Sequence, residues 1–278
     1  MTSLDTHVAV PGGSLKVVVD GPDDASPILL VHSAVVDLRS WDAMVPYLVD
    51  AGYRVIRYDA RGYGDSTTED VAFSNRADLL AVLDAVGVRQ VAVAGNSRGA
   101  MIALDTILEA PDRFVAYAWV GGGIGGYDGP GPSPEELALY ESYDAVEAAG
   151  DVDGMAEVDL RAWMDGVGQP PDRVPRALRE AFLTMDRPLV TPGRVFGKPI
   201  PLEPAADARL AEVAIPILVV VGELDSSGTR AAAVRLATGA PSTRLVSWPD
   251  VAHMIGMEVP DRLAATIVDF LAPLPRWH

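Results

Sequence analysis

A glycine-flanked serine between a predicted strand and a predicted helix constrains the fold of this chain more than any other feature. The segment Gly95-Asn96-Ser97-Arg98-Gly99 follows the apolar run Val91-Ala92-Val93-Ala94 and precedes the helix-like stretch Ala100-Met101-Ile102-Ala103-Leu104. A reversal this tight strains the backbone of the central serine, and only glycine leaves room two positions away on either side. The spacing predicts a serine whose hydroxyl projects from a sheet above a helix N-terminus. Taken alone, the pentapeptide is equally consistent with an ordinary strand-to-helix turn.

Short apolar runs alternate with helix-period segments along most of the chain. Such alternation is typical of an α/β fold, in which a mostly parallel sheet carries helices on both faces. We predict eight strands, the first two as an antiparallel hairpin around Pro11-Gly12-Gly13. The expected strands cover residues 8–10, 15–19, 28–31, 53–58, 91–94, 114–120, 215–221 and 243–248. The expected helices lie near residues 41–49, 76–86, 100–104, 229–238 and 261–271.

The alternation stops after Val120. A glycine-rich run at residues 121–126 leads into a mostly helical stretch and a proline-rich exit, and strand character resumes only near residue 215. We therefore predict a core of residues 1–125 and 209–278 with a helical cap inserted at residues 126–208. The glycine run matches the dinucleotide pattern G-x-G-x-x-G, but no helix opens on its last glycine. A hinge is the favoured interpretation, and we expect no cofactor.

Charge and composition exclude several classes of function. Among 278 residues the net charge is −17, with a pI near 4.5, which argues against binding to nucleic acid or to anionic membrane surfaces. The chain has no cysteine, so disulfides, thiolate metal sites and a cysteine nucleophile are excluded, and we expect no metal. Neither a signal peptide nor a bilayer-length apolar run is evident, so the expected location is cytoplasmic. Nothing in the pattern indicates an oligomeric state.

A serine hydroxyl needs a neighbouring base to act as a nucleophile. Two of the four histidines lie near the chain ends, and His32 precedes the serine in the chain. His253 lies between the last predicted strand and the last helix, on the edge of the sheet that also carries Ser97. The segment after residue 221 reaches the same edge and contains Asp225. The order Ser97, Asp225, His253 therefore predicts a nucleophile, an orienting carboxylate and a base.

Together these segments resemble the α/β-hydrolase superfamily over nearly the whole chain. Within it, the chain is most similar to capped bacterial carboxylesterases and to 3-oxoadipate enol-lactonase-like enzymes. The resemblance implies an α/β-hydrolase fold and a serine hydrolase that cleaves a small-molecule ester or lactone. The matching segments are Leu30-Val31-His32, residues 58–66, the Ser97 pentapeptide, Gly222-x-x-Asp225 and His253.

The resemblance also assigns roles to individual residues. Ser97 would attack the substrate carbonyl, His253 would transfer the proton, and Asp225 would orient the imidazole. The backbone N–H groups of Arg98 and Ala34 would form the oxyanion hole. Candidates for the substrate pocket are the side chains of Ser33, Val35, Trp163 and Arg98.

Several of these residues have a second interpretation. Glu223 could replace Asp225, although its place at the strand end makes it the weaker candidate. His32 resembles the structural histidine that braces the oxyanion loop, and Asp59, Arg61 and Asp65 look like a loop-stabilising polar cluster.

The cap residues and Arg98 also carry alternatives. Trp163 and Asp165 could belong to the interior of the cap and not face the substrate. The Arg98 guanidinium could recognise a substrate carboxylate, whereas an ion pair with a nearby Asp or Glu is the favoured alternative. The loop His32-Ser33-Ala34-Val35 departs from the glycine-rich loop of many relatives, which weakens the Ala34 assignment.

Two other classes of function share the same motifs. One is cofactor-free chemistry on the same triad, either perhydrolase or haloperoxidase activity or cleavage of a carbon-carbon bond. The other is a ligand receptor or an inactive relative that keeps the pocket without turnover.

Overall fold

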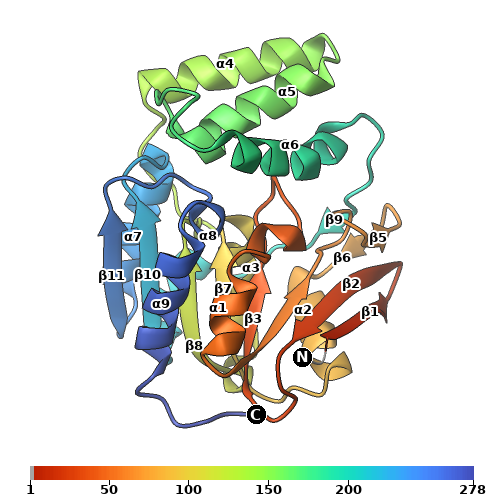
Figure 1. The fold of residues 1–278 in the computed structure, drawn as a ribbon, viewed down its shortest axis with the longest axis vertical. Coiled ribbons are helices and arrows are strands. Elements are labelled where there is room, and N and C mark those ends of the chain that lie inside the picture. Colours follow the sequence, from red (N-terminus) through yellow and green to blue (C-terminus); the bar gives the residue numbers. More distant parts are fainter. Residues whose placement is uncertain (1–2) are drawn as a thin grey trace.

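The computed structural model describes residues 3–278, so Met1 and Thr2, which the prediction places in the core, lie outside the described residues. A central sheet of nine strands carries helices on both faces (Figure 1). The predicted α/β class, with a mostly parallel sheet, is therefore confirmed.

Six neighbouring strands of the sheet are parallel, and a hairpin at one edge is antiparallel. Strand β3 lies between β4 and β7, so the chain order reverses beside it. At such a switch point the loops after two adjacent strands diverge at the carboxyl edge and leave room for a site. In sheet order the strands are β1 (Ser3–Val10), β2 (Gly13–Asp20), β4 (Tyr53–Tyr58), β3 (Ser26–Val31), β7 (Val91–Asn96), β8 (Phe114–Val120), β10 (Ile217–Gly222) and β11 (Thr243–Trp248).

The prediction of eight strands is wrong by one. The ninth strand, β5 (Thr67–Thr68), pairs with β2, and a separate small sheet joins β6 (Ala72–Phe73) to β9 (Lys198–Pro199). Strands of two residues contain no periodic pattern, so sequence reasoning cannot detect them.

Helices enclose the sheet in two layers. One face packs against α2, α3 and α7 through residues such as Leu79, Ile102 and Leu236. The other face packs against α1 and α9 through Leu48 and Leu263. The bounds of these helices are α1 (Val45–Asp50), α2 (Asn75–Ala85), α3 (Arg98–Glu109), α7 (Ser227–Gly239) and α9 (Pro260–Leu271). The other short helices of this part are η1 (Leu38–Trp41), η2 (Pro111–Arg113), η4 (Ala206–Glu212) and α8 (Ile255–Glu258).

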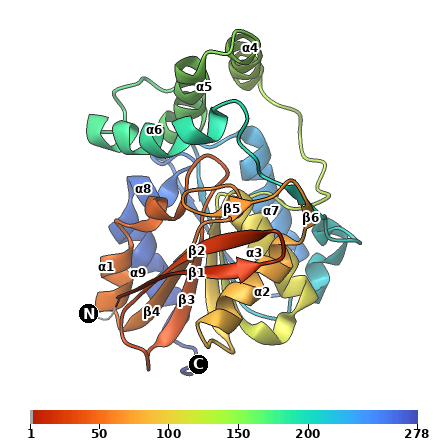
Figure 2. The ribbon, with the colours of Figure 1, turned by 90° about the vertical axis from the view of Figure 1, so that its right-hand side faces the viewer.

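A third group of helices lies over the carboxyl edge of the sheet (Figures 1 and 2). We call it the helical layer; it comprises α4 (Pro134–Ala148), α5 (Val152–Asp159), the π-helical η3 (Leu160–Gly166) and α6 (Arg176–Val190). The division into a core and an inserted cap at residues 126–208 stays a prediction.

Buried carboxylates attach the helical layer to α7 and α8 of the part below it. At the start of α4, Glu136 accepts hydrogen bonds from the backbone N–H and the hydroxyl of Ser227, both at 2.6 Å. Arg173, between η3 and α6, pairs with Glu258 of α8 at 2.7 Å. None of the helices within residues 3–278 has the length and apolar character needed to cross a membrane.

Candidate active site

Ser97 occupies a sharp turn between β7 and α3. Its φ of 56° makes it the one residue other than glycine with a positive φ between residues 3 and 278. A Cβ on Gly95 would lie 2.4 Å from the Gly99 carbonyl oxygen, and a Cβ on Gly99 would lie 2.2 Å from that of Val31. Both glycines are therefore required by close backbone approach, and the turn holds a half-buried serine at the carboxyl edge.

Asp225 and His253 meet at the same edge of the sheet. Asp225 follows β10, and His253 lies in the loop between β11 and α8. The His253 Nδ1 is 2.8 Å from Asp225 Oδ2 and 3.0 Å from Oδ1, and both side chains are buried. The carboxylate therefore holds a proton on Nδ1 and leaves Nε2 as the basic nitrogen. The alternative carboxylate, Glu223, instead accepts a hydrogen bond from Ser247 at 2.9 Å.

Asn96 connects the serine turn to the histidine loop. Its side-chain amide donates to the carbonyl of Val120 at 2.9 Å and to that of His253 at 3.1 Å. Space is scarce here, because a Cβ on Gly121 would lie 3.1 Å from Asp225 Oδ2. These contacts fix three strand ends relative to one another. Sequence reasoning missed Asn96, because the position between glycine and serine carries no pattern of its own.

The loop after β3 is braced by His32, which is fully buried. Its Nε2 accepts the backbone N–H of Ala60 at 3.0 Å, so Nδ1 carries the proton and donates to the Ser33 carbonyl at 2.7 Å. Burial lowers the pKa of His32 to about 4, so the ring is neutral near pH 7. These bonds support the structural interpretation of His32. Along the loop Ser33 is buried, Ala34 is exposed and Val35 is half-buried.

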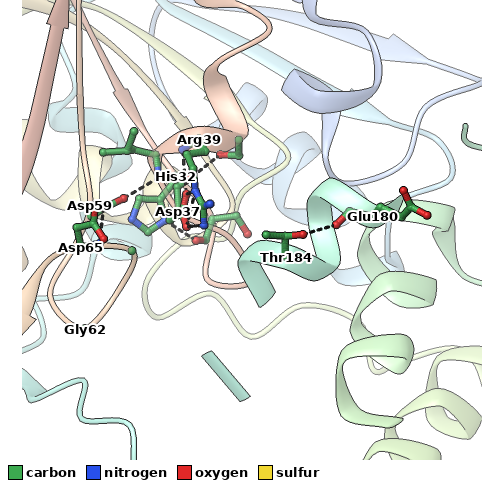
Figure 3. A network of polar contacts seen from close by, with 12 residues as sticks. His32, Asp37, Arg39, Asp59, Gly62, Asp65, Glu180 and Thr184 are labelled. Atoms are coloured by element: carbon green, nitrogen blue, oxygen red, sulfur yellow. Dashed lines mark hydrogen bonds and ion pairs between the residues drawn. The ribbon is translucent and has the colours of Figure 1, made fainter. Parts of the chain in front are cut away.

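Two members of the predicted polar cluster, Asp59 and Asp65, lie together in the neighbouring loop (Figure 3). Asp59 accepts the backbone N–H groups of Leu38 at 2.8 Å and Asp65 at 3.0 Å. Burial raises the pKa of Asp59 to about 7. Arg61 forms a two-pronged ion pair with Asp78, at 2.6 and 2.9 Å. Asp59 therefore braces the loop through backbone N–H groups, whereas Arg61 pairs with Asp78, which lies outside the predicted cluster.

Trp163 of the helical layer covers the histidine. The centroids of the Trp163 and His253 rings lie 4.8 Å apart, with 48° between the ring planes. The indole N–H donates to Asp159 at 3.1 Å. Burial raises the pKa of Asp159 to about 6. Asp165 instead pairs with Arg179, so it belongs to the interior of the layer.

Arg98 is half-buried at the start of α3 and makes no ion pair among the described residues. Its Nη2 donates to the side-chain oxygen of Asn75 at 3.1 Å, and its Cζ lies 4.8 Å from the centre of the Tyr63 ring. The predicted structural ion pair is therefore wrong, because the side chain turns toward an amide and an aromatic ring.

The structure thus brings four predicted residues to one edge: Ser97 and Arg98 on one turn, and Asp225 and His253 on the loops beside it. Trp163 joins them from above. Besides Asn96, sequence reasoning missed Asp159 and Glu258, which hold Trp163 and the backbone of the histidine loop. Each acts through a contact between distant segments, so no local pattern could identify it.

Known proteins resemble the chain in both sequence and fold. Residues 28–266 match the profile of the Alpha/beta hydrolase family. A rhodomycin D methylesterase from a Streptomyces species is 30% identical over 279 aligned residues, covering 90% of this chain and 91% of that protein. The 3-oxoadipate enol-lactonase 1 of Acinetobacter baylyi is 29% identical over 220 residues, or 77% of each protein. A hydrolase structure from Pseudomonas aeruginosa aligns with a TM-score of 0.76 at 27% identity, covering 96% of this chain and 98% of that one.

Proposed function

The chain belongs to the alpha/beta hydrolase family, and on that basis we propose that it is a serine hydrolase that cleaves a small carboxylic ester or lactone. One observation carries the proposal above all: the 2.8 Å contact between His253 Nδ1 and Asp225 Oδ2 at the edge that holds Ser97. A buried histidine with a carboxylate behind it is the arrangement that activates a serine hydroxyl.

In the proposed reaction, His253 Nε2 accepts the proton of Ser97 Oγ as this oxygen attacks the substrate carbonyl. The tetrahedral intermediate collapses when the imidazolium gives that proton to the leaving oxygen, which leaves an acyl group on Ser97. Water then attacks the acyl carbon while His253 takes its proton, and the imidazolium returns that proton to Ser97 Oγ as the acyl–oxygen bond breaks and the acid is released. Asp225 stabilises the imidazolium in both steps and keeps the ring in the required tautomer.

Two backbone N–H groups would stabilise the charge that develops on the carbonyl oxygen. The Arg98 N–H lies at the first position of α3, where the helix dipole also favours negative charge. The second donor in the proposal is Ala34, on the loop that His32 braces. Loss of one such donor costs about 3 kcal/mol of transition-state stabilisation.

The helical layer would act as a cap in this proposal. Residues 126–208 would cover the reacting groups, with Trp163 above His253 and with Ser33 and Val35 beside the nucleophile. An apolar cover that excludes water strengthens the electrostatic interactions inside the site. The expected partner is a small ester or lactone.

Hydrolysis of p-nitrophenyl butyrate by Ser97→Ala tests the proposal. We expect turnover to fall at least a thousandfold, while the control Ser247→Ala, a serine outside the site, stays close to wild type. Full activity of Ser97→Ala would refute the assignment. If the wild type cleaved a diketone, or formed a peracid from a carboxylic acid and hydrogen peroxide, without any ester turnover, the other chemistries of this triad would be favoured.

A further inference from the structure

The Arg98 guanidinium is a positive charge with no negative partner. Its Nη2 is bonded to a neutral amide oxygen, that of Asn75, and its face lies against the neutral Tyr63 ring. Its Nη1 is shielded from solvent and has no hydrogen-bond partner among residues 3–278. The donors of this side chain are therefore only partly satisfied.

Such an arrangement is costly for a purely structural residue. A partly buried cation loses hydration, and an amide and a ring compensate it less than a carboxylate would. The chain has many carboxylates, yet none lies within 4 Å of this guanidinium among the described residues. A shielded donor without a partner calls for an explanation, and a ligand that completes it is one such explanation.

The cation belongs to the residue next to the proposed nucleophile. Arg98 directly follows Ser97, and the start of α3 abuts the end of β3, as the 2.2 Å approach of a Gly99 Cβ to the Val31 carbonyl shows. The charge of Arg98 also helps to lower the pKa of His32, although burial is the larger cause. The guanidinium packs against the Tyr63 ring, whose centroid lies 5.0 Å from that of the His32 ring at the start of the loop after β3.

We propose that the Arg98 side chain binds a carboxylate on the acyl part of the substrate, so that the natural substrate is a half-ester or a carboxyl-bearing lactone. This inference rests on the proposed serine hydrolase function. The free Nη1 would donate to one carboxylate oxygen while Nη2 keeps Asn75 or turns to the second oxygen.

The overall charge of the protein makes this local cation decisive. With a net charge of −17, the protein as a whole repels an anionic substrate. A neutral ester has no need of a cation here, and a substrate cation would be repelled by it. The unpaired guanidinium therefore selects an anion at short range.

Matched esters test the inference. The monomethyl esters of succinate, glutarate and adipate are compared with the methyl esters in which an isopropyl group replaces the carboxylate, by methanol release. We expect at least one half-ester to exceed its neutral isostere in kcat/KM by roughly 10- to 100-fold in the wild type. In Arg98→Met this ratio should fall close to one, and Arg98→Lys should recover part of it.

The control is Arg39→Met, which removes a half-exposed arginine already paired with Asp37. Arg39→Met removes the same net charge as Arg98→Met without touching the proposed carboxylate contact. Its ratio of half-ester to isostere kcat/KM should therefore equal that of the wild type. Equal ratios in Arg98→Met and the wild type would overturn the inference, as would a wild-type ratio of one or less for all three pairs.

Binding separates this inference from the proposed function. If the wild type hydrolysed neither these esters nor p-nitrophenyl butyrate, the hydrolase proposal would fail. Titration calorimetry with glutarate and adipate would still test the carboxylate site in the wild type and in Arg98→Met. If Arg98→Met does not fold, Arg98→Lys takes its place. Binding that weakens about tenfold or more in the variants supports the site, and undetectable or unchanged binding overturns it.

Discussion

Asp186, on α6, should make the stability of the protein depend on pH in an unusual direction. Its side chain is buried, with 1% exposure, and neither carboxyl oxygen has a hydrogen-bond partner within the described part of the chain. Burial, followed by the nearby charge of Asp159 on α5, raises the pKa of Asp186 from 3.8 to about 8, while Arg187 acts in the opposite sense. Tyr143 of α4 faces the same acids, and its pKa is raised to about 12, mainly by burial.

The direction in which the free energy of unfolding changes with pH follows from proton binding. Between pH 4 and 8 the folded protein keeps a proton on Asp186 that the unfolded chain has lost, so the free energy of unfolding decreases as the pH rises. The limiting slope is about 1.4 kcal/mol per pH unit, and relaxation of the site should reduce the total to roughly 3 kcal/mol over this range. Below pH 4 and above pH 8 this group contributes no further slope.

Urea unfolding at pH 5, 6, 7 and 8, followed by circular dichroism, measures this slope. Asp186→Asn removes the ionisation and keeps the shape, so its slope should be flatter than that of the wild type. The control is Asp172→Asn, an exposed aspartate on the loop before α6. The reasoning is refuted if Asp186→Asn keeps the wild-type slope, or if wild-type stability increases between pH 5 and 8.

Three further substitutions test the geometry of the site. Asp225→Asn should lower kcat for ester hydrolysis by roughly 10³- to 10⁴-fold with little change in KM, because it favours the wrong imidazole tautomer; an effect below tenfold would contradict its orienting role. Gly99→Ala should destabilise the fold by at least about 2 kcal/mol in urea unfolding, since its Cβ would lie 2.2 Å from a backbone oxygen. The control Gly228→Ala, with nothing within 4 Å in α7, should be neutral or stabilising. Trp163→Ala should lower kcat/KM about tenfold by uncovering His253, and Trp163→Phe should recover most of it; equal rates for both variants would argue against the ring contact.

Local patterns predicted much of the fold because it depends on neighbours in the chain. The continuous apolar run of β3 is buried throughout, as expected for a strand covered on both faces. The glycines around Ser97 correctly indicated a tight strand-to-helix turn, since the steric requirement is local. The common carboxyl edge of the parallel strands explains why Asp225 and His253 could be expected to lie together.

Contacts between distant segments could not be predicted in the same way. Nothing near Arg98 in the sequence indicates that its partner is Asn75, or that no carboxylate approaches it. The ring contact of Trp163 with His253 joins residues 90 positions apart and depends on how the π-helical turn packs. The unpartnered carboxyl of Asp186 emerges only when three helices of the helical layer come together.

Mass spectrometry of the acyl-enzyme tests the central claim most directly. The protein is mixed with p-nitrophenyl butyrate, quenched in acid within the first turnovers and digested, and the butyryl group is located on the peptides. The account predicts an ester on Ser97 that disappears in Ser97→Ala together with turnover. An acyl group on another residue, or sustained hydrolysis by Ser97→Ala without any adduct, would contradict it.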